Sequence, residues 1–238
     1  MSFLFRFYIR DLIDKVTTMN LGFHLAGIVV DLLAYADDMV IIAPSWQALQ
    51  TLLLAVEDDA RKINMSFNTK KTVCMVFNPH NRHKIICATF PQFTLAGCEL
   101  QFVDSFRYLG HIIDNSLCDD KDIQREVKAL FTRTNILCRR FKRCSLQVKV
   151  KLFRSYCICL YDAALWSSFT VTALHKMSSC YNKCIKSFFN YAKYSSVTTM
   201  LLELGLPSFS TLLHNCRFSF NRNLLVCDNL LVNSLSSC

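Results

Sequence analysis

The sequence lacks the segments that would direct the chain out of the cell or hold it in a membrane. Its Phe-rich start carries Arg6 and Arg10 and has no small-residue cleavage site, so no secretory signal is predicted. The longest stretch without charge, 39–56, is interrupted by proline, serine and glutamine residues, which argues against a membrane span. The 13 cysteines are scattered and never spaced C-x-x-C. These absences predict an intracellular protein with reduced thiols, without distinguishing nucleus from cytoplasm.

Two common catalytic signatures are also missing. The chain has no G-x-x-x-x-G-K phosphate-binding loop, and its six histidines form no arrangement with a nucleophile. Its 52% apolar content nevertheless supports a globular protein with a good-sized core rather than a disordered tail. Evidence of function must therefore come from the charge distribution and from other motifs.

Positive charge is concentrated in one segment. The net charge is +9, and 121–154 holds eleven Lys or Arg against Asp122 and Glu126, so the rest of the chain balances to zero. Such a concentration is typical of a protein that grips a polyanion. A solvated basic helix face is the alternative interpretation. The densest group of these charges consists of Arg139, Arg140, Lys142 and Arg143.

The most informative motif is Tyr35-Ala36-Asp37-Asp38, set between the apolar runs 28–33 and 39–43. An unpaired buried charge costs roughly several kcal/mol, so adjacent carboxylates in such a setting either reach a solvent-facing tip or are neutralised by cations. β-branched and aliphatic residues dominate both runs, which predicts a β-hairpin with Asp37 and Asp38 at its turn. Two exposed carboxylates favour a hard divalent metal ion. An acidic turn without metal is the alternative.

The pattern of the remaining chain changes from mixed to helical near residue 118. Before that point, helices are predicted over about 3–16 and from the N-cap Ser45. Short strands are predicted at 73–77, 84–89, 93–96 and 99–103. Further helices are predicted from Asp119, from Ser145 with an apolar side that extends to Ala164, and over 174–191, with a break at Pro207. The fold class is therefore α+β, with domains 1–118 and 119–238.

Three motifs, in order along the chain, carry a resemblance to a known family. They are Tyr35-Ala36-Asp37-Asp38, Asn68-x-x-Lys71-Thr72 and Phe106-x-Tyr108-Leu109-Gly110. Through them the chain resembles the reverse transcriptase, or RNA-directed DNA polymerase, of non-LTR retrotransposons. The opening Phe3-Leu4-Phe5-x-x-Tyr8-Ile9-x-x-Leu12 is similar to the segment after that family's template-grip loop. The resemblance implies a partial polymerase palm over 1–118, made of an antiparallel hairpin, a helix and a small sheet, and an all-helical thumb-like lobe over 119–238.

The resemblance also implies roles for single residues. Asp37 would be the principal ligand of Mg²⁺ (or Mn²⁺) in two-metal nucleotidyl transfer, with Asp38 assisting. Lys71, or Lys70 in its place, would approach the nucleotide phosphates, and an ordinary exposed lysine is the alternative. The primer grip would consist of Phe106, Tyr108, Leu109 and Gly110.

Nucleic-acid contacts follow from the same resemblance. The helical lobe would track a duplex through phosphate contacts, which position a strand without reading its sequence. The residues implied in these contacts are Arg139, Arg140, Lys142 and Arg143. The partners of the parent enzyme would be an RNA template, a DNA primer and deoxynucleoside triphosphates.

The sequence has no counterpart of the third carboxylate that this kind of nucleotidyl transfer uses on an F-x-x-D-like strand upstream of the hairpin. Asp11 and Asp14 lie on a helix-like pattern near the start, and Asp31 falls within the hairpin arm. The family's fingers and Gln-Gly template loop are absent as well. We therefore expect the chain to begin inside the palm, as a truncated carboxyl-terminal portion, and to polymerise poorly or not at all by itself.

Two other functions stay open at this point. The first is a non-catalytic module that holds RNA or DNA through its basic helical lobe. The second is a metal-structured protein, although its candidate ligands match no common zinc spacing and a cysteine pair at i, i+4 suits a packed helix face. Those candidate ligands are Cys157, Cys159, Cys180, Cys184 and His175.

Overall fold

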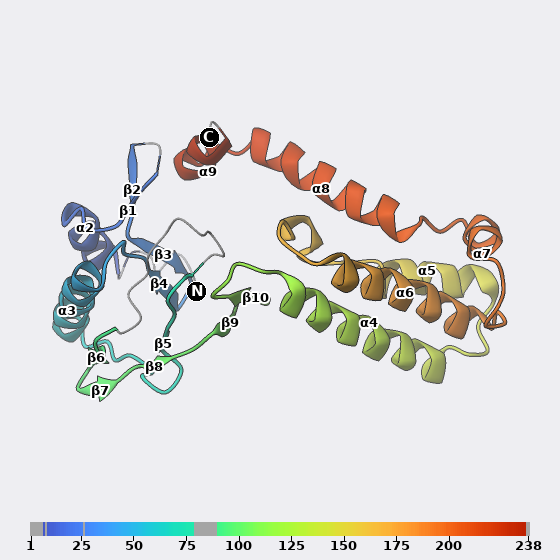
Figure 1. Ribbon diagram of the computed structural model, residues 1–238, viewed down its shortest axis with the longest axis horizontal. Helices are drawn as coiled ribbons and strands as arrows, with labels where there is room; N and C mark the ends of the chain where they lie inside the picture. The colour runs from blue at the N-terminus through green and yellow to red at the C-terminus, as the bar shows by residue number, and fades with distance from the viewer. Residues whose placement is uncertain (1–6, 8, 26, 79–89, 237–238) are drawn as a thin grey trace. The chain divides into compact units, whose positions relative to one another are not determined.

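The computed structural model describes residues 7, 9–25, 27–78 and 90–236, which form two compact units (Figure 1). The first unit comprises the described residues within 1–76, 81–103 and 224–238, and the second comprises those within 77–80 and 104–223. Among the described residues, no helix combines the length and the apolar character that crossing a membrane requires. The mixture of small hairpins and helices confirms the predicted α+β class.

Two packed helices, α2 (Arg10–Thr18) and α3 (Trp46–Lys62), form one core of the first unit. Their buried side chains are Leu12, Val16, Leu52, Val56 and Ala60. The helix predicted from Ser45 is confirmed, because the Ser45 hydroxyl accepts a hydrogen bond from the backbone N–H of Ala48 at 3.2 Å. The helix predicted over about 3–16 is found as α2, while residues 3–6 and Tyr8 of the opening motif lie outside the described residues.

The acidic motif lies in an antiparallel hairpin, as predicted. β3 (Leu32–Tyr35) pairs with β4 (Asp38–Ile41). The predicted first arm, 28–33, is not one strand: β2 (Ile28–Val30) pairs with β1 (Phe23–Leu25) instead. The chain changes partner at Asp31, whose carbonyl accepts a hydrogen bond from the N–H of Ile42 at 2.8 Å and so starts the second ladder.

Short strands complete the first unit. They are β5 (Val73–Cys74), which runs parallel to β8 (Gln101–Phe102), and the hairpin of β6 (Thr94–Leu95) with β7 (Cys98–Glu99). A second core is formed by Leu53, Cys74, Phe93, Leu95 and Leu100. The strands predicted at 73–77, 93–96 and 99–103 are therefore present but shorter, and the strand predicted at 84–89 lies outside the described residues.

The second unit begins with a hairpin and continues as helices. β9 (Ser105–Tyr108) pairs with β10 (His111–Asp114). The elements that follow are α4 (Asp120–Arg140), α5 (Leu146–Tyr156), a 3₁₀ turn (Ala163–Leu165), α6 (Val171–Phe189), α7 (Val197–Leu204) and α8 (Phe209–Leu225), whereas α9 (Leu230–Ser236) is grouped with the first unit.

α4 and α6 lie side by side and run in the same direction (Figure 1). Three contacts follow one another along both helices: Asp120 to Thr170 at 2.8 Å, the carbonyl of Val127 to the Cys180 thiol at 3.7 Å, and Cys138 to Ser187 at 3.8 Å. The core that the helices share contains the fully buried side chains of Leu130, Phe153, Trp166, Met177 and Tyr181.

The helices predicted from Asp119 and over 174–191 are confirmed, and so is the break at Pro207. The helix from Ser145 is shorter than predicted, because α5 ends at Tyr156 and the chain then turns to bury Leu160 and Ala163. The predicted domains 1–118 and 119–238 stay a prediction. Within the compact units, the hairpin at 105–114 groups with the helices.

Asp31 supplies a test of this fold. Its side chain is buried, and Oδ2 has no hydrogen-bond partner among the described residues. A buried carboxylate oxygen without a partner destabilises the folded state more than a neutral amide does. We expect Asp31→Asn to raise the free energy of unfolding by about 1 kcal/mol in denaturant titrations. Asp11→Asn, at an exposed position of α2, is the control that gives no such gain, and a loss of stability in Asp31→Asn would contradict the prediction.

Candidate active site and nucleic-acid interface

The acidic turn presents both carboxylates to solvent. Tyr35 lies opposite Asp38 in the β3–β4 register, so Ala36 and Asp37 form a two-residue turn. Ala36 adopts a positive φ of 52°, a conformation that costs a residue other than glycine about 1 kcal/mol. Asp37 and Asp38 are exposed, and no ion pair of the described residues engages them. The exposed hairpin turn is thereby confirmed, while metal ligation by the two residues stays a prediction.

The donor set of this turn fits a hard divalent cation. Adjacent carboxylates that form no ion pair with a described lysine or arginine leave oxygen atoms free to bind an ion such as Mg²⁺. Among the described residues, no third His, Cys, Asp or Glu brings a ligand atom into a group with Asp37 and Asp38. Asp31 is no such ligand, because the four residues of β3, at about 3.3 Å each, and the turn residue Ala36 separate it from Asp37.

Lys71 and Lys70 lie in the same unit as the acidic turn but are not joined to it. Both are exposed, in a turn where the N–H groups of Lys71 and Thr72 donate to the Asn68 carbonyl at 2.9 and 3.0 Å. This turn leads into β5, as the motif predicts. No hydrogen bond or ion pair of the described residues links either lysine to Asp37, so their predicted role stays a prediction.

The predicted primer grip is a tight hairpin turn between β9 and β10. Leu109 and Gly110 have φ angles of 47° and 96°, the pair of positive values that a two-residue turn of type I′ requires. Phe106 and Leu109 are about 40% exposed, whereas Tyr108 is half-buried. The tip therefore offers apolar side chains to solvent.

A buried polar network joins this hairpin to the helices. Arg125 of α4 donates from Nε to Asp122 at 2.6 Å and from Nη2 to both oxygens of Asp162, at 2.7 and 2.8 Å. The ring of His111, the first residue of β10, lies 3.0 Å from Asp162. Trp166 donates its indole N–H to Asp122 at 2.8 Å. Asp122 and Asp162 are both buried, so the network depends on these partners.

The same residues include the one group of three potential metal ligands among the described residues. Ligand atoms of His111, Asp122 and Asp162 lie within 4.8 Å of one another. The guanidinium of Arg125 already binds both carboxylates, however, and a metal ion would have to displace it. We therefore interpret the group as a buried ion-pair network and not as a metal centre.

The charge of the buried carboxylates is set by these contacts. Burial alone raises the pKa of Asp122, but hydrogen bonds from Arg125, Trp166 and the N–H of Ile112 outweigh burial and hold that pKa below its ordinary value. Burial likewise raises the pKa of Asp114 at the end of β10. Hydrogen bonds from Lys121, at 2.6 Å, and from Ser116 outweigh it and lower the pKa to about 2. The hairpin is thus tied to α4 at two points.

The predicted nucleic-acid contacts lie at one corner of the second unit. Arg139 and Arg140 end α4, and Lys142 and Arg143 follow in the turn to α5. All four are exposed, and no ion pair of the described residues engages them. Cations at the last turn of a helix also stabilise the helix dipole, so part of this charge has a structural explanation.

The structure also has a second basic surface, which the sequence pattern did not indicate. It lines a hollow of about 950 Å³ between α4 and α6, to which Lys128, Lys176 and Lys183 contribute exposed ammonium groups and Phe131 an exposed ring. No ion pair of the described residues engages these three lysines. Lys176 and Lys183 lie outside the basic segment 121–154, and only the packing of α6 on α4 brings them beside Lys128.

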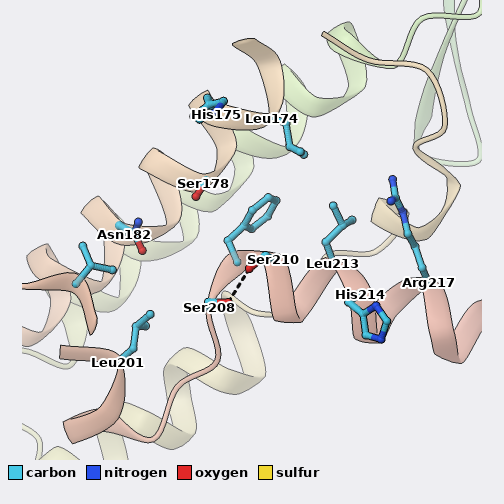
Figure 2. Close-up of a pocket in the computed structure, with 12 residues that line it drawn as sticks. Leu174, His175, Ser178, Asn182, Leu201, Ser208, Ser210, Leu213, His214 and Arg217 are labelled. Atoms are coloured by element: carbon cyan, nitrogen blue, oxygen red, sulfur yellow. Dashed lines mark hydrogen bonds between the residues drawn. The ribbon is translucent and has the colours of Figure 1, made fainter. Parts of the chain in front are cut away.

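A smaller hollow, of about 400 Å³, lies between α6, α7 and α8 (Figure 2). Its lining is mainly apolar, with His175 and His214 as titratable groups, and no carboxylate belongs to it. Arg217 donates to the carbonyl of Trp166 at 2.7 Å and thereby serves the fold. No hydrogen bond or ion pair of the described residues joins either histidine to a carboxylate that would orient it for acid–base catalysis.

The cysteines give no support to a metal-structured protein. Cys157, Cys180 and Cys184 are buried in the helical core, where burial raises the pKa of the Cys157 thiol to about 11. His175 and Cys159 are exposed. No group of three ligands that contains a cysteine occurs among the described residues.

Comparisons with known proteins agree with the motifs. The reverse transcriptase (RNA-dependent DNA polymerase) family matches residues 2–113. The chain is also similar to the RNA-directed DNA polymerase from mobile element jockey of Drosophila funebris, with 27% identity over 188 residues. This alignment covers 73% of the chain and 19% of that protein, so the chain spans about a fifth of the length of the curated relative it matches.

The buried network makes a strong prediction about stability. In Arg125→Met, Asp122 and Asp162 lose their shared cation and stay buried, which costs about 3–5 kcal/mol of unfolding free energy. Helical circular dichroism during denaturation measures the effect. Lys128→Met, an exposed position on the same helix, is the matched control with little change. A loss in Arg125→Met no larger than in the control would show that water reaches the carboxylates.

Proposed function

From the match of residues 2–113 to the reverse transcriptase (RNA-dependent DNA polymerase) family, we propose that the chain is a portion of the RNA-directed DNA polymerase of a non-LTR retrotransposon. The proposal rests on the acidic turn, where Asp37 and Asp38 are exposed side by side between two apolar strands. Two adjacent, exposed carboxylates at the tip of an apolar hairpin are explained physically if a cation binds there.

Asp37 and Asp38 would hold Mg²⁺ or Mn²⁺ through their carboxylate oxygens. When bound, a divalent ion offsets negative charge on the reacting phosphate oxygens during nucleotidyl transfer. Lys71 or Lys70 would add a cation for the phosphates of the incoming deoxynucleoside triphosphate. The tip at 106–110 would position the end of the DNA primer on its RNA template. We propose that this nucleotidyl transfer takes place inside the cell.

The helical unit would hold the duplex by its phosphates. Exposed arginine and lysine side chains without carboxylate partners give affinity that is independent of sequence and falls with salt. The corner from Arg139 to Arg143 carries four such charges. The hollow with Lys128 adds three more.

A second function is favoured by the same basic surfaces. The helical unit has its own buried core, so it would bind RNA or DNA without any catalysis by the acidic turn. We propose that this binding is the main activity of the chain alone. Its sequence offers two of the three carboxylates that the polymerase reaction uses, and the ion between them would be held weakly.

Titration with Mn²⁺ tests the metal proposal. We expect paramagnetic broadening of amide resonances to appear first at 35–39, because the two exposed carboxylates lie there, and to be lost in Asp37→Asn combined with Asp38→Asn. The same protein should extend a DNA primer on a homopolymer RNA template no more than background. Broadening that is strongest around His111 would refute the assignment. Robust extension abolished by Asp37→Asn would refute the claim that the chain alone is inactive.

Salt-dependent binding tests the nucleic-acid contacts. Replacement of Arg139, Arg140, Lys142 and Arg143 by Gln should weaken duplex binding alike for all sequences and reduce the slope of log K against log salt by up to about 3.6. Anisotropy titrations at several salt concentrations measure the slope.

The matched control removes the same number of charges from the first unit. Replacement of Arg10, Lys15, Arg61 and Lys62 by Gln removes cations that are already paired with carboxylates, and should leave the slope nearly unchanged. Equal slopes in both variants would show that net charge, and not the corner, governs binding.

A further inference from the structure

Tyr161 is an exposed aromatic residue on a well-anchored corner. Its side chain is 78% exposed, although the neighbours Leu160 and Asp162 are buried at 6% and 3%. The backbone on either side is hydrogen-bonded, with the N–H of Leu160 donating to Ile158 at 2.8 Å and that of Leu165 to Asp162 at 2.9 Å. The corner therefore presents the ring from a defined position.

The ring of Tyr161 lies against the turn of the β9–β10 hairpin. A Cβ atom placed on Gly110 would be 3.7 Å from Cε1 of Tyr161, an ordinary van der Waals contact. Asp162, the next residue, binds the ring of His111, which directly follows Gly110. Arg125 fixes Asp162 in turn. The buried network thus holds the corner and the turn together within one unit.

The surface around Gly110 combines charge with apolar groups. Arg107 is exposed, donates from Nε to the Gly110 carbonyl at 3.3 Å, and forms no ion pair with a carboxylate among the described residues. Leu109 is 41% exposed at the turn itself. A guanidinium with donors that are not engaged suits a phosphate, and a tyrosine ring at the same turn suits the face of a base or sugar.

We propose that Tyr161 and Arg107 form a contact site for the terminal nucleotide of a strand, with the Tyr161 ring against its base or sugar and Arg107 on its phosphate. This inference rests on the proposed function of the hairpin. Arg107 stands at the open position of the 106–110 motif, and Tyr161 lies beyond the residues that match the family. Stacking of one base on an aromatic side chain contributes about 1–3 kcal/mol.

Two probes separate a terminal contact from general duplex binding. One is an RNA–DNA duplex with a recessed DNA 3′ end, and the other is a closed dumbbell of the same length. With the full chain, Tyr161→Ala should weaken anisotropy-measured binding of the recessed duplex about fivefold or more, and leave binding of the dumbbell unchanged. Tyr161→Phe, which keeps the ring, should bind both probes as the parent chain does. Arg107→Gln should reduce the salt slope by about 1.

Tyr194→Ala is the matched control, because Tyr194 is 89% exposed and lies in the turn between α6 and α7. It should change binding of neither probe. Thermal unfolding of each variant checks that the fold is retained. The inference would be overturned if Tyr161→Ala bound the recessed duplex normally, or if it lost affinity equally for both probes. In either case, salt-dependent binding by the parent chain would still support the proposed function. A parent chain with no salt-dependent binding would overturn both.

Discussion

The arrangement of the helical unit depends on one guanidinium group. Arg125 lies between the buried carboxylates of Asp122 and Asp162, and its hydrogen bonds offset the cost of removing these two charges from water. Asp122 comes from the same helix, whereas Asp162 comes from the corner after α5. His111 adds the β9–β10 hairpin to the same network. A single half-buried cation therefore sets the positions of a helix, a corner and a hairpin turn relative to one another.

The acidic residues of the chain occur in two opposite environments, one buried and ion-paired and the other exposed. Asp122 and Asp162 are buried and neutralised by partners, whereas Asp37 and Asp38 lie at a solvent-exposed tip and pair with no cation of the described residues. The first arrangement stabilises a structure, since its oxygen atoms are already bound. The second leaves oxygen atoms available, which is the condition for holding an external cation. This contrast explains why the cluster around His111 resembles a metal site in composition but not in chemistry.

Local signals predicted much of the fold. The hydroxyl of Ser45 and the helical spacing that follows it predicted α3, and the apolar runs around Asp37 predicted a hairpin, because both depend on residues close in sequence. Longer-range effects changed the rest. Asp31 divides one apolar run between two hairpins, and α5 ends at Tyr156 because the next apolar residues are buried in a turn and not along a helix face. An apolar pattern cannot distinguish these two ways of burial.

The sequence by itself determined the acidic turn, the motif order and the family resemblance, since each is carried by neighbouring residues. Tertiary structure alone decided which distant residues share a surface. Lys176 and Lys183 join Lys128 only because α6 packs beside α4 in the same direction. Tyr161 reaches Gly110, 51 residues earlier in the chain, only because a buried ion pair holds its corner there. Contacts of this kind depend on packing and desolvation across the whole unit, and no local pattern encodes them.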